Sequence, residues 1–456
     1  MVRQGLAGVR IGTLTLGCKV NQYETDSMRE LLEQAGAELT EFEDEADVYL
    51  VNTCSVTNMA ERKSRQMLHR ARKKNADALV VAVGCYVQTT PKEVLDDLSV
   101  DIVVGNNRKK EIAAILEDAI AKRNQSREVC HWFDINQGAE YEPLTISHMT
   151  EHTRAYIKIQ DGCNQFCSYC IIPYVRGRIR SREPEEILEE IRRLAAQGCK
   201  EVVLTGIHLS SYGKDWEKET ASDGKLNGEP LLKLIQKINE IEGICRIRLG
   251  SLEPRIMTET FVTELAGVEK LCPHFHLSLQ SACNETLKRM NRKYTIEEYM
   301  EGCERLRKVF DRPALTTDVI VGFPGETEEE FETTYENLKK LNLYEMHIFK
   351  YSRRRGTRAE QMPDQVPEQI KAIRSDKLLE LTAGQKKAYE ESFRGEPLQV
   401  LVEECLDTEK KRLAEGCREE VEAGKQWYVG HTERYQRVTL QSEQDVRNQV
   451  VEVVRS

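Results

Sequence analysis

Residues 161–173 read DGCNQFCSYCIIP, with cysteines at positions 163, 167 and 170. They follow an apolar run typical of a β-strand, AYIKIQ (155–160), so the cysteines lie where a strand ends. Structural zinc sites close with four protein ligands, and ferredoxin clusters commonly take four thiolates. Because the stretch supplies three cysteines and no fourth ligand, it predicts a metal centre with an open coordination position. Such a position can bind a small molecule, which indicates a catalytic role.

The size and composition of the chain indicate a soluble protein of several domains. Its 456 residues suffice for about three domains, and its 14 cysteines are too few for a disulfide scaffold. The longest apolar run, ALVVAVGCYV (78–87), is shorter than the roughly 20 residues of a membrane span. The N-terminus MVRQGLAGVRIG lacks a secretory pattern. We therefore expect a cytoplasmic protein without a membrane partner.

The charge is unevenly distributed along the chain. The net charge of −10 argues against bulk attraction to nucleic acid. Basic side chains nevertheless gather in four runs, at 62–74, 176–182, 288–293 and 350–358. Each run by itself could be a solvated face, but four together favour an anionic partner.

The hydrophobic pattern predicts an α/β protein with three parts. The runs VRIGTLTLGC (9–18), ADVYLVNTC (46–54) and ALVVAVGC (78–85) are separated by helical patterns at about 23–35 and 59–74, which is typical of a doubly wound parallel sheet. A polar stretch at 136–154 predicts a linker. Six further apolar runs between about 155 and 355, each followed by helical sequence, predict a partial (β/α)6 barrel. Alternating runs beyond Pro397 predict a small all-β module.

Three cysteines are enough for one known kind of catalytic centre. In a [4Fe-4S] cluster held by Cys163, Cys167 and Cys170, the fourth iron can chelate the amino and carboxylate groups of S-adenosylmethionine. One electron from the cluster then cleaves that cofactor to a carbon radical. The alternative is a zinc site completed by His152 or a distant residue.

Two further motifs support the interpretation as a [4Fe-4S] cluster. With them the chain resembles the radical S-adenosylmethionine superfamily. Residues Thr205 to His208 resemble the loop that meets the methionyl amine, and VIVGFPGE (319–326) resembles the glycine motif beside the adenosine. The resemblance implies cofactor contacts from seven residues: Thr205, Gly206, His208, Ser278, Gln280, Gly322 and Gly325. A simpler alternative is that Gly206 and Gly325 are turn residues, and that Thr327 and Glu330 form a capping box.

A second cysteine triplet lies in the N-terminal part. Cys18, Cys54 and Cys85 each follow a predicted strand, and the carboxyl ends of parallel strands meet at one edge of a sheet. The three thiols can therefore converge on a second [4Fe-4S] cluster, again with an open iron, which could carry a sulfide. For any single one of them the alternative is a buried structural cysteine.

With two such triplets the chain resembles the methylthiotransferases. That family implies an auxiliary-cluster domain at 9–122, a radical core at 149–380 and a TRAM-type RNA-binding domain at 383–446. The segments GCKVNQYETDSM (17–28), NTCSVTNMAERKSRQ (52–66) and CIIPYVRGRIRSR (170–182) resemble the branch acting on N6-threonylcarbamoyladenosine next to the anticodon. The alternatives are the branch acting on isopentenyladenosine, the branch acting on a ribosomal protein aspartate, or an iron–sulfur protein without turnover.

This resemblance implies a radical reaction without an acid or base residue. The adenine C2–H is not acidic, but a 5′-deoxyadenosyl radical can abstract its hydrogen. The resemblance implies that a first S-adenosylmethionine methylates a sulfide bound to the auxiliary cluster and that a second one generates the radical. The implied partners are a tRNA anticodon stem-loop, a flavodoxin- or ferredoxin-like electron donor and an unidentified sulfur donor.

Eight arginines are the candidate contacts to the RNA backbone: Arg176, Arg178, Arg180, Arg182, Arg353, Arg354, Arg355 and Arg358. Some of them could instead pair with acids. Acidic residues outnumber basic ones from Glu396 to the end, which casts doubt on RNA binding by charge there. Trp427, Tyr428 and Tyr435 could stack on bases or fill the module's core.

Overall fold

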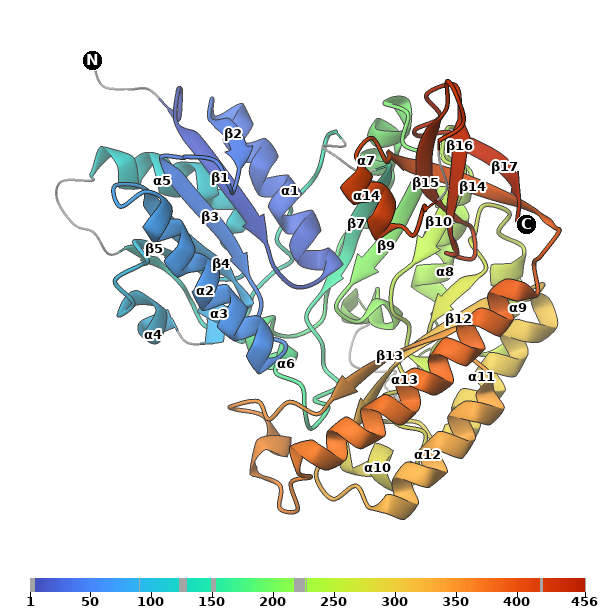
Figure 1. Cartoon of the computed structure of the whole chain (residues 1–456). Helices are drawn as coiled ribbons and strands as arrows, with labels where there is room; N and C mark the ends of the chain where they lie inside the picture. The colour runs from blue at the N-terminus through green and yellow to red at the C-terminus, as the bar shows by residue number, and fades with distance from the viewer. Residues whose placement is uncertain are drawn as a thin grey trace.

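The computed structural model describes residues 5–89, 91–122, 129–148, 153–216, 226, 228–418 and 421–455. Its sheets follow one another along the chain in three regions (Figure 1). His152, the alternative zinc ligand, and residue 149, the predicted start of the radical core, lie outside the described residues. None of the helices in the described ranges is long and apolar enough to cross a membrane.

The N-terminal region is a parallel six-stranded sheet in the order β2-β1-β3-β4-β5-β6. Its strands are β1 (Arg10–Thr15), β2 (Glu38–Glu41), β3 (Val48–Thr53), β4 (Leu79–Gly84), β5 (Ile102–Val104) and β6 (Val129–His131). Its helices are α1 (Lys19–Gln34), α2 (Asn58–Lys74), α3 (Cys85–Thr89), α4 (Pro91–Leu95) and α5 (Ile112–Ala121). Met28 of α1 packs with Leu50 on one face, and Leu68 of α2 packs with Val51 on the other. Helices therefore cover both faces of the sheet.

Among its described residues the central region has seven strands. They are β7 (Arg154–Asp161), β8 (Arg180–Ser181), β9 (Glu201–Gly206), β10 (Arg246–Leu249), β11 (His274–His276), β12 (Ala314–Val321) and β13 (Glu345–Lys350). Parallel pairing gives the orders β7-β9-β10 and β11-β12-β13, and isolated parallel bridges such as Leu252 to Leu277 connect the two groups. Only β8 is antiparallel, at the edge beside β7. Six strands thus run in the same direction and in chain order.

Helices separate these strands, as the sequence pattern predicts. They are α6 (Ile172–Val175), α7 (Pro184–Ala196), α8 (Glu229–Asn239), α9 (Glu259–Ala266), α10 (Asn284–Arg289), α11 (Ile296–Val309), α12 (Glu328–Leu341) and α13 (Glu368–Glu391). Alternate strand residues, such as Ile157, Leu204 and Ile247, join the core beneath the helices. The residues between them face the other side of the sheet, where Arg248 and Asp318 lie. The inner face of the sheet is therefore polar.

The C-terminal region is an antiparallel sheet of four strands in the order β16-β15-β14-β17. Its elements are β14 (Pro397–Cys405), α14 (Glu409–Ala414), β15 (Gln426–Thr432), β16 (Arg437–Ser442) and β17 (Val450–Val454). Figure 1 shows these strands beside the central region. Arg246 donates to the His431 carbonyl at 2.9 Å, and Arg248 donates to the Glu433 carbonyl at 3.0 Å. The C-terminal sheet is thus docked on the central strands by buried arginines.

The predicted pattern of strands agrees with the structure. The differences concern the residues at which elements begin and end. Helix α1 begins at Lys19, four residues before the predicted start, because Cys18 already serves as its N-cap. The capping box of Thr327 and Glu330 is confirmed at the start of α12. Within the predicted linker, the described residues 136–148 form neither helix nor strand. The predicted domain boundaries remain predictions.

Candidate active site

The loop that carries Cys163, Cys167 and Cys170 lies between β7 and α6 and is fixed at several points. Cys163 N–H donates to the Gly177 carbonyl at 3.0 Å, and Ser168 N–H donates to the Met290 carbonyl at 2.9 Å. Asn291 donates its side-chain amide to the Phe166 carbonyl at 2.9 Å. These bonds tie the loop to the segment after α10, so the three thiols have a defined arrangement.

The three thiols share one electrostatic environment. Burial, together with the neighbouring Cys167, raises the pKa of Cys163 to about 12. Burial and the two other cysteines also raise the pKa of Cys170. Arg292 places its Nη1 3.2 Å from the Cys167 sulfur. A cation at this place favours thiolates, the form that binds metal. Sequence reasoning saw Arg292 only as part of a basic run.

The predicted loop after β9 lies next to the cysteine loop. His208 N–H donates to Gln160 Oε1 at 2.8 Å, and its Nε2 lies 2.9 Å from Glu253 Oε2. Gln165, inside the cysteine loop, donates to the same Glu253 oxygen at 3.1 Å. Burial alone would raise the pKa of Glu253, but His208 and Arg255 outweigh it and lower the pKa to about 2. Glu253 is therefore an anion between two predicted site segments.

Glu253 was not predicted from the sequence because its signal is weak, a single acid after β10, the third of the six parallel strands. A search for polar residues at the carboxyl ends of all six parallel strands would have found it.

The remaining predicted cofactor residues lie at the same ends of β11 and β12. Arg292 Nη2 donates to the Ser278 carbonyl at 3.0 Å, which connects Ser278 to Cys167. Gln280 N–H donates to the Asp318 carbonyl at 2.9 Å. Gly322 has φ +71°, and a Cβ there would lie 2.3 Å from Lys371 Cγ, so this turn requires glycine. Contact of these residues with a cofactor stays a prediction.

Cys18, Cys54 and Cys85 follow three neighbouring strands, β1, β3 and β4. Burial, together with the charges of Cys85 and Cys18, raises the pKa of Cys54 to about 11. Desolvation also raises the pKa of Cys18, whereas Arg176 lowers it. Cys85 acts on both Cys18 and Cys54, and a Cβ on Gly17, the neighbour of Cys18, would lie 2.9 Å from the Cys54 sulfur, so the three cysteines lie near one another.

Helix α6 connects the two cysteine triplets. It follows Cys170 directly, and its Val175 packs with Cys85 in one apolar cluster. Asn106 donates to the Val175 carbonyl at 2.8 Å and lies 3.7 Å from the Cys85 sulfur. The segment after the first cysteine loop thus contacts the region of the second triplet.

Comparison with known proteins agrees with this geometry. The model of the Radical SAM superfamily matches residues 157–338, and that of Uncharacterized protein family UPF0004 matches residues 10–105. A Bacillus subtilis (strain 168) protein named threonylcarbamoyladenosine tRNA methylthiotransferase MtaB is 39% identical over 441 residues, covering 96% of this chain and 92% of the relative. The Aquifex aeolicus (strain VF5) protein of the same name is 42% identical, covering 86% of this chain and 93% of the relative.

The chain belongs to the radical S-adenosylmethionine methylthiotransferase family. A Carboxydothermus hydrogenoformans relative named tRNA-2-methylthio-N(6)-dimethylallyladenosine synthase is 36% identical, covering 88% of this chain and 89% of the relative. Among solved structures, the radical S-adenosylmethionine methyltransferase TsrM from Kitasatospora setae has a TM-score of 0.55 at 16% identity, covering 75% of this chain and 72% of that chain. That likeness shows the fold alone.

Three of the arginines after the cysteine loop are buried in this methylthiotransferase, which argues against their predicted contact with the RNA backbone. Arg176, Arg180 and Arg182 are buried. Arg176 donates to Glu24 at 2.8 Å, Arg180 lies 3.7 Å from Asp161, and Arg182 pairs with Glu190. Phosphate contact is therefore not assigned to these three. Arg178 is exposed and lies 4.5 Å from the centre of the Phe166 ring.

The candidate arginines at 353–358 also include both buried and exposed side chains. Arg354 is buried and pairs with Glu61 of α2, which connects the segment after β13 to the N-terminal region. Phosphate contact is not assigned to Arg354 either. Arg353, Arg355 and Arg358 are exposed, although Arg355 lies 3.0 Å from Glu93.

The aromatic side chains of the C-terminal sheet of this methylthiotransferase are mostly core residues. Trp427 and Tyr428 are buried in two apolar clusters. Tyr435 lies between Arg154 and Arg248, whose guanidinium carbons are 5.0 and 4.8 Å from the ring centre. These contacts favour the core alternative over base stacking for all three.

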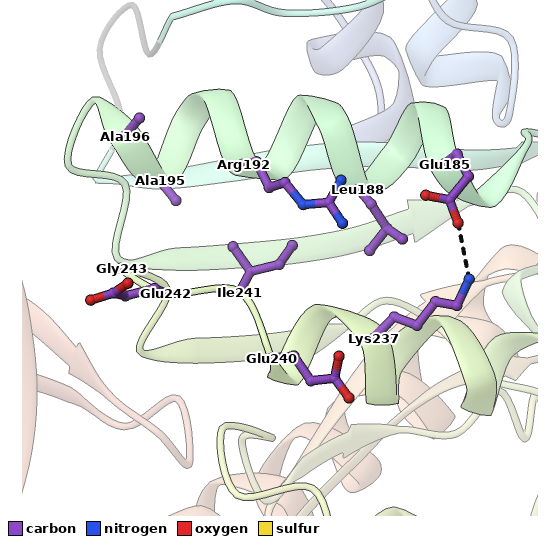
Figure 2. A pocket seen from close by; sticks show the side chains of 10 residues that line it. All are labelled: Glu185, Leu188, Arg192, Ala195, Ala196, Lys237, Glu240, Ile241, Glu242 and Gly243. Carbon is purple, nitrogen blue, oxygen red and sulfur yellow. Dashed lines mark hydrogen bonds and ion pairs between the residues drawn. The ribbon is translucent and has the colours of Figure 1, made fainter.

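A hollow of about 690 Å³ lies between α7 and α8 (Figure 2). Lys237 and Glu185 form an ion pair of 3.0 Å across it. None of its lining residues belongs to either cysteine triplet or to the predicted cofactor contacts. The hollow is therefore separate from the predicted site.

Proposed function

We propose that this methylthiotransferase inserts a methylthio group at C2 of N6-threonylcarbamoyladenosine next to the anticodon of tRNA. The observation that carries the proposal is the pair of three-cysteine sites joined by α6. The relatives named for this substrate support the choice, since three of them, 37–42% identical to the chain, exceed the 34–36% of relatives named for dimethylallyladenosine.

The cysteine loop fits a [4Fe-4S] cluster. It offers three fixed thiols beside the cation Arg292 and no fourth cysteine within the loop, so one iron would remain for S-adenosylmethionine. When bound, the cluster and S-adenosylmethionine supply a carbon radical that can abstract hydrogen from the adenine C2. His208, Glu253 and Ser278 would orient the S-adenosylmethionine from the strand ends.

The second triplet fits another [4Fe-4S] cluster. Cys18, Cys54 and Cys85 provide three thiols, and Arg176 supplies a buried cation close to them. We infer that this site holds the sulfur that is transferred. The closeness of Cys85 to α6 supports delivery to a base bound between the two sites.

The RNA would meet the exposed basic side chains near this site. They are Arg62, Lys63, Arg65 and Lys73 of α2 together with Arg178, Arg353, Arg355 and Arg358. A base in an anticodon loop can be unstacked at modest cost and presented to the site. We further propose that the central strands form a partial (β/α)6 barrel, that the C-terminal sheet is a TRAM-type RNA-binding domain, and that a flavodoxin- or ferredoxin-like protein in the cytoplasm supplies electrons.

Nucleoside mass spectrometry tests the substrate. Cells lacking the gene should lose the 2-methylthio derivative of threonylcarbamoyladenosine, and the intact gene should restore it. Genes encoding Cys163→Ala or Cys18→Ala should not. Unchanged methylthiolation in the deletion strain would refute the proposed substrate, and loss of methylthiolated isopentenyladenosine instead would favour the other tRNA branch.

Iron analysis tests the two sites. After anaerobic reconstitution we expect about eight irons per chain in the intact protein and about four in Cys54→Ala, because each cluster holds four. Four irons or fewer in the intact protein would contradict the second cluster.

A further inference from the structure

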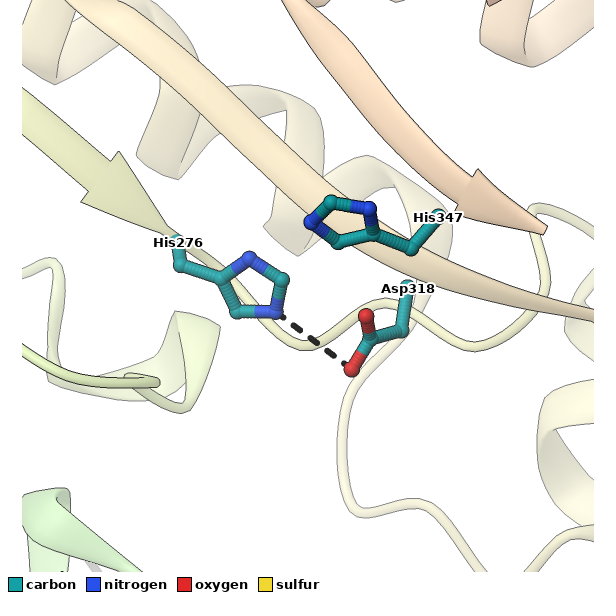
Figure 3. Close-up of side chains that lie close together, drawn as sticks. All are labelled: His276, Asp318 and His347. Carbon is teal, nitrogen blue, oxygen red and sulfur yellow. Dashed lines mark ion pairs between the residues drawn. The ribbon is translucent and has the colours of Figure 1, made fainter. Parts of the chain in front are cut away.

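Three polar side chains form a cluster on the inner face of the central strands. His276 belongs to β11, Asp318 to β12 and His347 to β13 (Figure 3). Asp318 and His347 are direct partners in the parallel register, and the register partner of His276 is Thr316, two residues before Asp318. Their nitrogen and oxygen atoms lie within 4.8 Å of one another.

On one side of the cluster the hydrogen-bonding groups are paired, and on the other side they can bind a ligand. His276 Nδ1 lies 3.0 Å from Thr316 Oγ1, and its Nε2 lies 3.4 Å from Asp318 Oδ2. The His347 ring stacks on the His276 ring, with centroids 5.9 Å apart. In the described part of the chain His347 has no hydrogen bond or ion pair, and its side chain is exposed. His347 is therefore available to a ligand.

The cluster lies close to the radical half of the active site. His276 precedes Ser278 by two residues, about 7 Å along a strand. The Ser278 carbonyl is joined through Arg292 to the sulfur of Cys167. Phe349, on the same face of β13 as His347, leaves 48% of its surface exposed. An exposed phenyl ring on this face can stack with an adenine next to His347.

The chemistry of the cluster matches one of the two tRNA substituents. A threonylcarbamoyl group carries a carboxylate, a hydroxyl and urea N–H groups, whereas a dimethylallyl group is apolar. The His347 ring can donate to a carboxylate, and the open oxygen of Asp318 can accept from a hydroxyl or N–H. An apolar substituent would leave both groups desolvated without partners, which costs free energy.

We propose that His347, supported by Asp318 and His276, binds the N6-threonylcarbamoyl group and selects this substrate over an apolar N6 substituent. The proposal rests on the function proposed above and adds the residues that determine specificity.

The test uses the reconstituted protein and three anticodon stem-loops of one sequence. Their target adenosine carries threonylcarbamoyl, its carboxylate methyl ester, or dimethylallyl. We expect kcat/KM to be about ten- to a hundred-fold higher for the acid than for the ester, as for loss of a charged hydrogen bond. In His347→Ala this ratio should fall to near one. His148→Ala, an exposed histidine outside the cluster, should keep the ratio of the intact protein.

The ratio of kcat/KM for the acid to kcat/KM for the ester distinguishes a loss of recognition from a structural defect. A misfolded site would lower both values alike and leave their ratio unchanged. Affinities measured by fluorescence anisotropy without S-adenosylmethionine should show the same loss of preference. A ratio retained in His347→Ala, or no preference in the intact protein, would overturn the inference alone. An intact protein that modifies only the dimethylallyl RNA would overturn the proposed function and the inference with it. One equivalent of a non-iron metal, lost in His347→Ala, would identify the cluster as a metal site instead.

Discussion

The positions of the auxiliary cysteines depend on glycines beside them. Gly17 has φ +106°, and a Cβ there would lie 2.9 Å from the Cys54 sulfur. Gly84 has φ +98°, and a Cβ there would lie 2.5 Å from Asn52 Oδ1. L side chains rarely adopt such φ values, so both positions require glycine for conformation and for space. The glycines let the strand ends approach closely enough for three thiols to share one site.

Gly17→Ala should therefore damage the auxiliary site selectively. The added methyl must displace Cys54, so we expect reconstituted iron to fall from about eight to about four per chain, with one cluster retained. Gly8→Ala is the matched control, since Gly8 has φ +72° and no atom within 4 Å of an added Cβ. Equal iron loss in both variants would mean that backbone strain, and not contact with Cys54, is responsible.

At the scale of elements, a buried charge network joins α1 to β7 and α6. Glu24 of α1 accepts from Lys158 at 2.7 Å and from Arg176 at 2.8 Å, and it also pairs with Lys109. Burial alone would raise the pKa of Glu24, but Arg176, Lys109 and Lys158 outweigh it and hold the pKa well below its ordinary value. The network connects the region of the auxiliary cysteines to the strand that precedes the cysteine loop.

Breaking this network should cost much stability. Glu24→Gln removes the carboxylate of buried Lys109 and one of the two carboxylates that neutralise buried Lys158 and Arg176, which also contact Asp161. For this we expect a loss of about 3–5 kcal/mol in the free energy of unfolding. Urea unfolding followed by circular dichroism measures the change. Glu33→Gln, on the more exposed side of the same helix, should cost less than about 1 kcal/mol. Similar losses in both variants would contradict a special role for Glu24.

At the scale of the whole molecule, buried arginines join the C-terminal sheet to the central strands around one carboxylate. Glu201 lies 2.8 Å from Arg248 and 3.8 Å from Arg246, and both arginines also donate to carbonyls of the C-terminal sheet. Burial alone would raise the pKa of Glu201, but Arg248, Arg154 and Arg246 outweigh it and lower the pKa. The junction therefore depends on an ionised Glu201.

The lowered pKa of Glu201 predicts that the stability of the protein depends on pH. Because the folded pKa of Glu201 is depressed, its contribution is fully present above the ordinary value of about 4.3 and is lost as the pH falls through the folded pKa. We expect the thermal midpoint of the intact protein to exceed that of Glu201→Gln by a constant amount above about pH 5.5 and by less below pH 4. A difference that does not change between pH 7 and pH 3 would contradict this assignment.

Local patterns predicted the elements well because they report burial directly. The apolar runs at 46–54 and 78–85 became β3 and β4, and the alternation after residue 155 became six parallel strands. Cysteines at strand ends could be assigned to one edge of a sheet, since parallel strands end together. Such rules need only the chain direction and the period of the hydrophobic residues.

The partners of charged residues could not be predicted in this way. Arg176 and Arg178 look alike in the sequence, yet one is buried against Glu24 and the other is exposed. The sequence alone determined the strands, the helices and the two cysteine triplets, because these follow from local period and spacing. Only the tertiary structure decided which arginines are structural and that His276, Asp318 and His347 meet, because those contacts join residues far apart in the chain.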